Sequence, residues 1–150
     1  MSITVRIATL DDAPIIAPLF NAYRMFYGQR SDLDAASSFI TERLRNNQSV
    51  IFMALYKTGV IGFTQLYPVF SSVSMKNAWL LNDLYVVETK RGMGAATALL
   101  EAAKEHGRQT GSAWVMLQTA ANNHPAQMAY KSNGWVKDEE YYVYTINLTK

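Results

Sequence analysis

The chain has 150 residues, of which 49% are hydrophobic and 17% charged, so we expect one globular domain and not a disordered chain. A formal charge of +2 is too small to indicate a nucleic-acid-binding surface, and the absence of cysteine excludes disulfides, thiolate zinc sites and cysteine nucleophiles. No apolar run approaches the roughly 20 residues that cross a bilayer. We therefore expect a cytoplasmic protein with no metal, no nucleic-acid partner and no membrane partner.

A strand and two helices are predicted first along the chain. Residues 3–8 alternate between apolar and polar side chains, as a strand does. The first helix, capped by Thr9 or Asp11, has Pro14 near its start and Pro18 deep enough to kink or delay it. The second helix begins at a capping box over residues 31–34. The two apolar helix faces consist of Ile16, Phe20, Tyr23 and Tyr27, and of Leu33, Ala36, Ile40 and Leu44.

A hairpin and a long strand come next. Residues 50–56 and 60–67 flank the turn signal Lys57-Thr58-Gly59, which predicts a hairpin in which Gly62 marks a bulge. We expect a loop over residues 68–77 and a central strand over residues 79–87.

The second half of the chain alternates helices and strands. A helix follows Gly94 and ends near Gly107 or Gly111, and the apolar run 114–118 predicts a buried parallel strand. Residues 125–134 run from a proline to a glycine, as a short helix does. Alternation over residues 142–148 predicts a last strand. The order β-α-α-β-β-β-α-β-α-β predicts an α+β fold with α/β/α layers and a mixed, mostly antiparallel sheet.

The turn Arg91-Gly92-Met93-Gly94-Ala95-Ala96 joins the end of the central strand to the start of a helix. Backbone N–H groups at a helix start point outward at the positive end of the helix dipole, so this turn is suited to an anion. Glycine at 92 and 94 lets the main chain approach a bulky phosphate. The alternative interpretation is an ordinary glycine turn between strand and helix.

These residues resemble the GCN5-related N-acetyltransferase (GNAT) family, and the resemblance spans nearly the whole chain. The family signature is Arg or Gln, two residues, Gly, one residue, then Gly or Ala, and residues 91–96 match it. A second family pattern is an Asn followed seven residues later by a Tyr near a Gly-aromatic pair, which Asn123, Tyr130 and Gly134-Trp135 match. The resemblance implies six to seven strands, about four helices, acetyl-CoA (coenzyme A) as donor and an amine as acceptor.

In such a fold the loop amides bind the pyrophosphate, and the central strand lies beside the pantetheine arm and polarises the thioester. Asn123 also fits a simple helix cap, and the strand residues also fit an ordinary core strand. The coenzyme-binding residues that the resemblance implies are Leu84, Tyr85, Val86, Arg91, Gly92, Met93, Gly94, Ala95, Ala96, Thr97, Asn123, Ala126 and Tyr130.

Two residues are candidates for proton transfer. The resemblance implies that Tyr130 donates a proton to the coenzyme sulfur, and a phenol with a pKa near ~10 is protonated at neutral pH. Its alternative role is an aromatic anchor between helix and sheet. Asp83 lies in an otherwise apolar strand, and buried charges need partners or purposes. It could take a proton from the incoming ammonium, attract that cation, or form a structural ion pair.

The sequence indicates the acceptor-binding residues less specifically than the coenzyme-binding residues. The segment around Asp83 resembles diamine acetyltransferases, which carry two adjacent acidic residues, but Asn82 stands in the first of those places and weakens a polyamine assignment. The segment around Tyr23 resembles a branch that acetylates histones, polyamines or small amines, although Tyr23 and Tyr27 also fit an ordinary amphipathic helix face. The candidate acceptor-binding residues are Tyr23, Tyr27, Gln65, Tyr67, Asn82 and Asp83.

The leading prediction is an acetyl-CoA-dependent N-acetyltransferase that acts on a primary amine by direct attack in a ternary complex. The acceptor could be a small amine, an amino acid, a polyamine or a protein lysine. A catalytically silent acyl-CoA-binding regulator on the same fold is one alternative, and a protein-interaction module with a structural glycine turn is another. The density of tyrosine over residues 141–148 predicts a paired sheet edge and hence a homodimer.

Overall fold

The structure is a computed structural model that describes residues 2–57 and 59–149. Thr58, in the predicted hairpin turn, lies outside the described residues. The chain divides into two compact units, Met1–Gln118 and Thr119–Lys150, and each is described by itself. No helix within the described ranges is long and apolar enough to span a bilayer.

The first unit is built on a five-stranded sheet in the order β1-β2-β3-β4-β5. The first four strands pair antiparallel, and β5 pairs parallel with β4. The prediction of six to seven strands is therefore wrong, since the described residues form five. The strand bounds are Ile3–Ile7 (β1), Val50–Tyr56 (β2), Gly59–Ser71 (β3), Lys76–Val86 (β4) and Val115–Met116 (β5).

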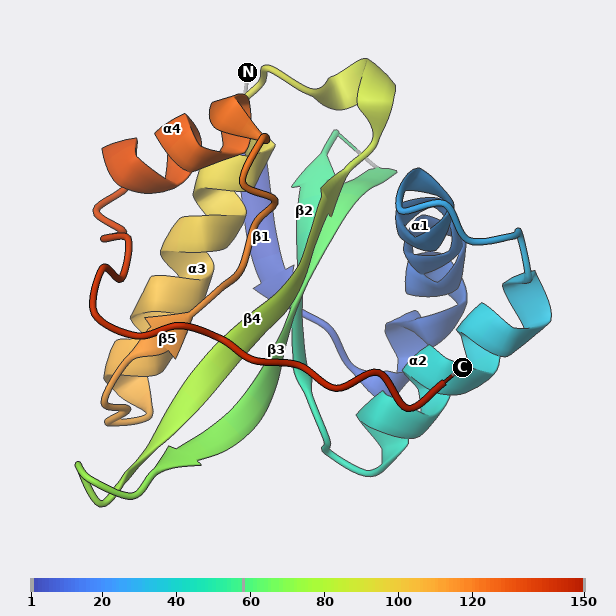
Figure 1. The fold of residues 1–150 in the computed structure, drawn as a ribbon. Coiled ribbons are helices and arrows are strands. Elements are labelled where there is room, and N and C mark those ends of the chain that lie inside the picture. The colour runs from blue at the N-terminus through green and yellow to red at the C-terminus, as the bar shows by residue number, and fades with distance from the viewer. Residues whose placement is uncertain (1, 58, 150) are drawn as a thin grey trace. The chain divides into compact units, whose positions relative to one another are not determined.

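Helices cover both faces of this sheet (Figure 1). Helices α1 (Ala13–Phe26) and α2 (Leu33–Arg45) lie on one face and α3 (Ala95–Gln109) on the other. Alternate residues of β2 divide between two cores, since Met53 packs toward α1 and α2 and Ala54 toward α3. The predicted α/β/α layering of a mixed sheet is confirmed. The fully buried core side chains include Ile16, Ile40, Ile51, Met53, Phe63 and Leu99.

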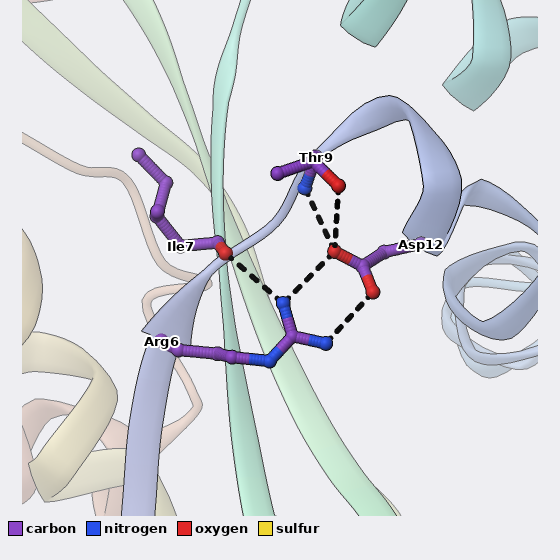
Figure 2. Close-up of polar contacts among 4 residues, drawn as sticks. All are labelled: Arg6, Ile7, Thr9 and Asp12. Atoms are coloured by element: carbon purple, nitrogen blue, oxygen red, sulfur yellow. Dashed lines mark hydrogen bonds and ion pairs between the residues drawn. The ribbon is translucent and has the colours of Figure 1, made fainter.

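An ion pair ties the end of β1 to the start of α1 (Figure 2). Arg6 Nη2 lies 2.8 Å from Asp12 Oδ1, and the Thr9 N–H donates to Asp12 Oδ2 at 2.8 Å. Asp12 closes a short 3-10 turn, Leu10–Asp12, from which α1 continues. The hydrogen bond from Arg6 lowers the pKa of Asp12 to about 2. The carboxylate therefore satisfies a backbone donor at the place where the chain leaves the sheet.

Helix α1 begins at Ala13 and runs through Pro18 without interruption, so the predicted delay is wrong, while the kink stays a prediction. Pro18 is exposed. The backbone carbonyl of Pro14 loses its helical partner there, and because Pro14 is exposed as well, water can satisfy that carbonyl.

The predicted loop over residues 68–77 is wrong, because β3 and β4 continue through most of it. Their pairing extends from Gly62 opposite Val86 to Ser71 opposite Lys76. Pairing of β2 with β3 ends at Leu66, so Pro68 lies on a part of β3 whose other edge has no strand beside it among the described residues. Proline lacks an N–H to donate and is tolerated in such an edge position.

The predicted last strand over residues 142–148 is also wrong. This segment forms no helix or strand, and its large side chains are exposed, with Tyr144 at 93%. Alternation of apolar and polar side chains indicates only that one face of a strand could be buried. A strand also needs a neighbouring strand to supply its backbone hydrogen bonds. The sheet edge on which the predicted homodimer depended is therefore absent from the described residues.

The second unit contains helix α4, which covers His124–Ser132. The Asn123 side chain accepts a hydrogen bond from the Ala126 N–H at 3.3 Å, and Pro125 lies in the first turn. The predicted short helix and its cap are confirmed, and Gly134 follows the helix with a positive φ of 89°.

Candidate active site

The junction between β4 and α3 leaves backbone donors open. A second 3-10 turn, Glu88–Lys90, leads into residues 91–94, and α3 begins at Ala95. The first hydrogen bond of the helix is from the Ala98 N–H to the Gly94 carbonyl at 3.0 Å, and no side chain caps the helix. The N–H groups of residues 95–97 thus have no acceptor among the described residues. A helix start of this kind binds anions.

Both glycines of the loop are in the left-handed region, with φ of 82° at Gly92 and 89° at Gly94. A Cβ added at either position would meet nothing within 4 Å. The backbone of the loop is therefore uncovered, and a phosphate can approach it without displacing a side chain.

Arg91 brings a positive charge to the same loop. Its Nε donates to the Val86 carbonyl at 2.9 Å, and its guanidinium lies 5.5 Å from the centre of the Phe26 ring and 5.7 Å from that of Tyr85. The guanidinium is therefore held at the end of β4 by the Val86 carbonyl and by the rings of Tyr85 and Phe26. Among the other loop residues, Thr97 is exposed, Met93 and Ala96 are half-buried and Ala95 is buried.

The end of β4 has one unpaired edge. The Val87 N–H donates to the Ile61 carbonyl at 2.8 Å on the β3 side. Because backbone groups alternate along a strand, the N–H groups of Leu84 and Val86 point to the opposite edge. On that edge β5 pairs only with Trp79 and Leu80, and no other described strand follows it (Figure 1). This edge leads directly to the glycine loop, residues 91–94.

Asp83 lies in a buried polar cluster between β3 and β4. It is 3% exposed, and its carboxylate accepts hydrogen bonds from the Gln65 amide and, at 3.0 Å, from the Asn82 amide. The Ser49 hydroxyl donates to Gln65 Oε1 at 2.7 Å, and the Thr64 hydroxyl donates to the Asp83 carbonyl at 2.7 Å. The register between β3 and β4 shifts between Gln65 and Leu66, and such an irregularity increases the local twist of the paired strands.

The electrostatics of the cluster follow from burial. Burial raises the pKa of Asp83, while hydrogen bonds from Gln65, Tyr23 and Asn82 act in the opposite direction. Burial and then the nearby charge of Asp83 raise the pKa of Tyr23, and the same two causes raise that of Tyr67 to about 12. Both phenols are therefore neutral donors at physiological pH.

Aromatic rings surround the Asp83 cluster on the α1 side. The centre of the Tyr23 ring lies 5.9 Å from that of Phe63, 6.2 Å from that of Tyr85 and 5.1 Å from that of Tyr27. The Tyr23 hydroxyl donates to the Asn82 carbonyl at 3.2 Å. Tyr27 is 63% exposed, so the rings extend from the carboxylate to the surface. We call Tyr23, Tyr27, Phe63 and Tyr85 the aromatic cluster.

The structure brings together most of the residues that the sequence singles out. Tyr23, Gln65, Asn82 and Asp83 share one hydrogen-bonded cluster, and Tyr27 adjoins it. Leu84 to Thr97 form the adjacent strand end, loop and helix start. No ion pair to Asp83 occurs in the described part of the chain, so the structural alternative of a Lys or Arg partner is not observed.

Three of the predicted coenzyme-binding residues, Asn123, Ala126 and Tyr130, belong to the second unit. Asn123 caps α4, and the Tyr130 ring lies 6.3 Å from that of Trp135. Their placement as coenzyme ligands, with Ala126, stays a prediction.

Four residues of the site were not identified from the sequence. Ser49 and Thr64 belong to the polar cluster, and Phe63 and Phe26 contribute rings. Ser49 acts through Gln65, sixteen positions away, and only the strand register reveals that contact. For Phe26, the neighbouring Tyr27 was the available signal.

Comparisons with known proteins agree with this geometry. Residues 16–135 match the family model described as the acetyltransferase (GNAT) family. The chain is 48% identical over 144 residues to the uncharacterized N-acetyltransferase YhfO of Bacillus subtilis (strain 168), covering 96% of this chain and 97% of that protein. It is 33% identical over 111 residues to a probable acetyltransferase of Haemophilus influenzae, covering 73% of this chain and 76% of that protein.

A solved structure gives the same result for the fold. The crystal structure of a probable acetyltransferase superposes with a TM-score of 0.93 at 40% identity, covering 98% of this chain and 99% of that one. The family model, the two sequence relatives and this neighbour all agree. The chain belongs to the GNAT family of acetyltransferases.

Proposed function

We propose that this enzyme transfers the acetyl group of acetyl-CoA to a primary amine by direct attack in a ternary complex. The observation that carries the proposal is the open start of α3, with left-handed Gly92 and Gly94, immediately after the unpaired edge of β4. The start of α3 fits a diphosphate, and the unpaired edge of β4 fits the amide-containing pantetheine arm. The two features follow one another along the chain.

The residues present fit coenzyme A. The N–H groups of residues 95–97 and the guanidinium of Arg91 would hold the pyrophosphate, and the exposed Thr97 hydroxyl is available to it. The free N–H groups of Leu84 and Val86 would bind the pantetheine arm, and one of them would polarise the thioester carbonyl. When bound, acetyl-CoA supplies an acetyl group that is already activated as a thioester. No covalent enzyme intermediate is then needed.

Proton transfers accompany this reaction. The amine nitrogen forms a bond to the acetyl carbon, the carbon–sulfur bond breaks, and the sulfur leaves with the bonding electrons. Asp83 would attract the ammonium form of the acceptor and take up the proton that it loses before attack. Tyr130 would donate the proton that the sulfur gains, a role that rests on the match of residues 123–135 to the family pattern. The nitrogen loses its second proton once it is bonded to the acetyl carbon, and that proton would restore the Tyr130 phenol.

The test is amine-dependent release of free thiol from acetyl-CoA. We expect release to saturate with both substrates and to require them together, as direct attack demands. Tyr130→Phe should lower kcat by about 10²-fold or more, with little change in coenzyme affinity, because general acid catalysis contributes roughly that much. Coenzyme binding without amine-dependent thiol release, across amines of every class, would contradict the proposed transfer. Unchanged kcat in the Tyr130 variant would remove only the acid assignment.

Location in the cytoplasm and assembly as a homodimer stay predictions. The exposed tyrosines over residues 141–148 are the remaining reason to expect the dimer.

A further inference from the structure

The starting observation is a buried carboxylate whose described hydrogen-bond partners are all neutral. The Gln65 and Asn82 amides donate to Asp83, the neutral Tyr23 phenol also lowers the pKa of this carboxyl, and none of the three carries a positive charge. A buried carboxylate with no positive charge beside it is costly, because buried charges are ordinarily paired with an opposite charge. An ammonium that replaced one neutral donor would therefore gain stability at this place.

The approach to that carboxylate lies on the side of Asn82. Asn82 is exposed, and its amide covers Asp83 Oδ1, whereas Gln65 covers Oδ2 from within the buried cluster. The Tyr23 hydroxyl is bonded to the carbonyl of the same Asn82. An incoming ammonium would thus displace the Asn82 amide and meet the Tyr23 ring.

The walls of this approach are aromatic. The aromatic cluster reaches the surface at Tyr27, and the neighbouring Phe26 is 61% exposed. Aromatic faces attract an ammonium, and they bury apolar or flat groups that the ammonium carries.

The charges around the aromatic cluster favour a single positive charge on the ligand. Arg91 lies over the Tyr85 ring, and the positive charge of Arg43 on α2 acts on Tyr67. Arg43 is itself paired with Glu42 at 3.1 Å. Asp83 is the one carboxylate of the described residues that acts on Tyr23 and Tyr67. A second ammonium on the ligand would find no second carboxylate among the described residues that act on these two phenols.

We propose that the acceptor is a monocationic primary amine on an apolar, preferably aromatic, body, with its ammonium at Asp83 and its body on the aromatic cluster. This inference rests on the proposed function, because it names the amine of that same reaction. Polyamines and other polycations are excluded as preferred acceptors.

A binding measurement tests the acceptor class without any turnover. The chain is saturated with coenzyme A, which has no acetyl group to transfer, and is titrated calorimetrically with 2-phenylethylamine or with 1,4-diaminobutane. We expect the aromatic monoamine to bind at least ten times more tightly than the diamine. Equal or tighter binding of the diamine, or no saturable binding of either amine, overturns the inference.

Variants assign the effect to the named residues. Asp83→Asn should weaken binding of 2-phenylethylamine at least tenfold, whereas Glu101→Gln, which removes an exposed carboxylate on α3, should leave it unchanged. Asn82→Asp is at an exposed position and adds a second carboxylate beside Asp83. It should raise the affinity for the diamine relative to the monoamine at least tenfold. Unchanged affinities in both Asp83→Asn and Asn82→Asp contradict the inference.

Thiol release measured in parallel separates the two proposals. Amine binding as expected, without release from acetyl-CoA, contradicts the proposed transfer and supports only the class of amine that binds at Asp83 and the aromatic cluster. Release that is fastest with the diamine supports the transfer and contradicts the acceptor class.

Discussion

The orientation of the Gln65 amide follows from its two neighbours. The Ser49 hydroxyl donates to Gln65 Oε1, so the amide nitrogen is the end that faces Asp83. Ser49 and Gln65 are both buried, so neither can exchange this contact for water without cost. Ser49 is therefore a positioning residue that acts on the carboxylate through Gln65.

Ser49→Ala should make Asp83 harder to ionise. Without the hydroxyl, the Gln65 amide is less firmly held and donates less well to the carboxylate, so the already raised pKa of Asp83 should rise further. Because ionised Asp83 would be the active form, the acidic limb of the pH profile of kcat/KM should move upward. Loss of one hydrogen bond corresponds to about one pH unit at most.

The matched control is Ser38→Ala, which removes an exposed hydroxyl on α2. It should leave the acidic limb in place. An identical profile for Ser49→Ala and the unaltered chain would make Ser49 purely structural.

At the scale of residues, the sequence predicted which residues belong to the site better than it predicted the contacts between them. Asp83 and Tyr23 stand out because a carboxylate interrupts an apolar strand and a tyrosine lies on a helix face. The Ser49 contact could not be predicted, because it depends on Val50 pairing with Leu66, and register is a non-local property.

At the scale of elements, the junction of β1 and α1 depends on one carboxylate. Asp12 receives the Thr9 N–H and pairs with Arg6 (Figure 2). Asp12→Ala should lower the free energy of unfolding by about 1 kcal/mol at neutral pH through loss of the helix-start hydrogen bond. That loss corresponds to roughly 2–4 °C in Tm for a chain of this size.

The pH dependence of this loss has a definite sign. The pKa of Asp12 is lowered to about 2 in the folded chain, so its ionisation stabilises the fold at any pH above the ordinary value of 3.8. That contribution disappears as the pH falls from 3.8 to about 2. Thermal unfolding of Asp12→Ala and Asp11→Ala, its exposed neighbour, should differ at pH 7 and converge near pH 2. A difference that persists at pH 2 would contradict the ionic origin.

Most elements were predicted correctly where local pattern and burial agree, as in α2. Its N-cap, however, is Asp32, which accepts from the Ala35 N–H at 3.1 Å, and not Ser31 of the predicted capping box. The bulge at Gly62 was also predicted, and a Cβ there would meet the Tyr85 carbonyl oxygen at 2.7 Å. The extension of β3 past Pro68 was not predicted. A proline is tolerated in this strand because β2 no longer pairs with β3 at that point, and the position where β2 ends is a property of the sheet. The local sequence does not contain that information.

At the scale of the whole molecule, the residues named in the proposed function are divided between the two units. The first unit contains the open start of α3, the unpaired edge of β4 and Asp83, while Tyr130 belongs to the second. The alternating segment 142–148 was predicted as a strand from side chains alone. Its pattern could not reveal whether a hydrogen-bonding neighbour exists.

The central claim is that the junction of β4 and α3 binds the diphosphate of the coenzyme, and calorimetric titration with coenzyme A tests it most directly. Gly94 and Gly111 stand at opposite ends of α3, with φ of 89° and 65°, and a Cβ at either meets nothing within 4 Å. Tryptophan should therefore cause similar backbone strain at both, of about 1–2 kcal/mol. We expect Gly111→Trp to bind like the unaltered chain and Gly94→Trp to bind at least tenfold more weakly. Equal affinities in the two variants would contradict the account.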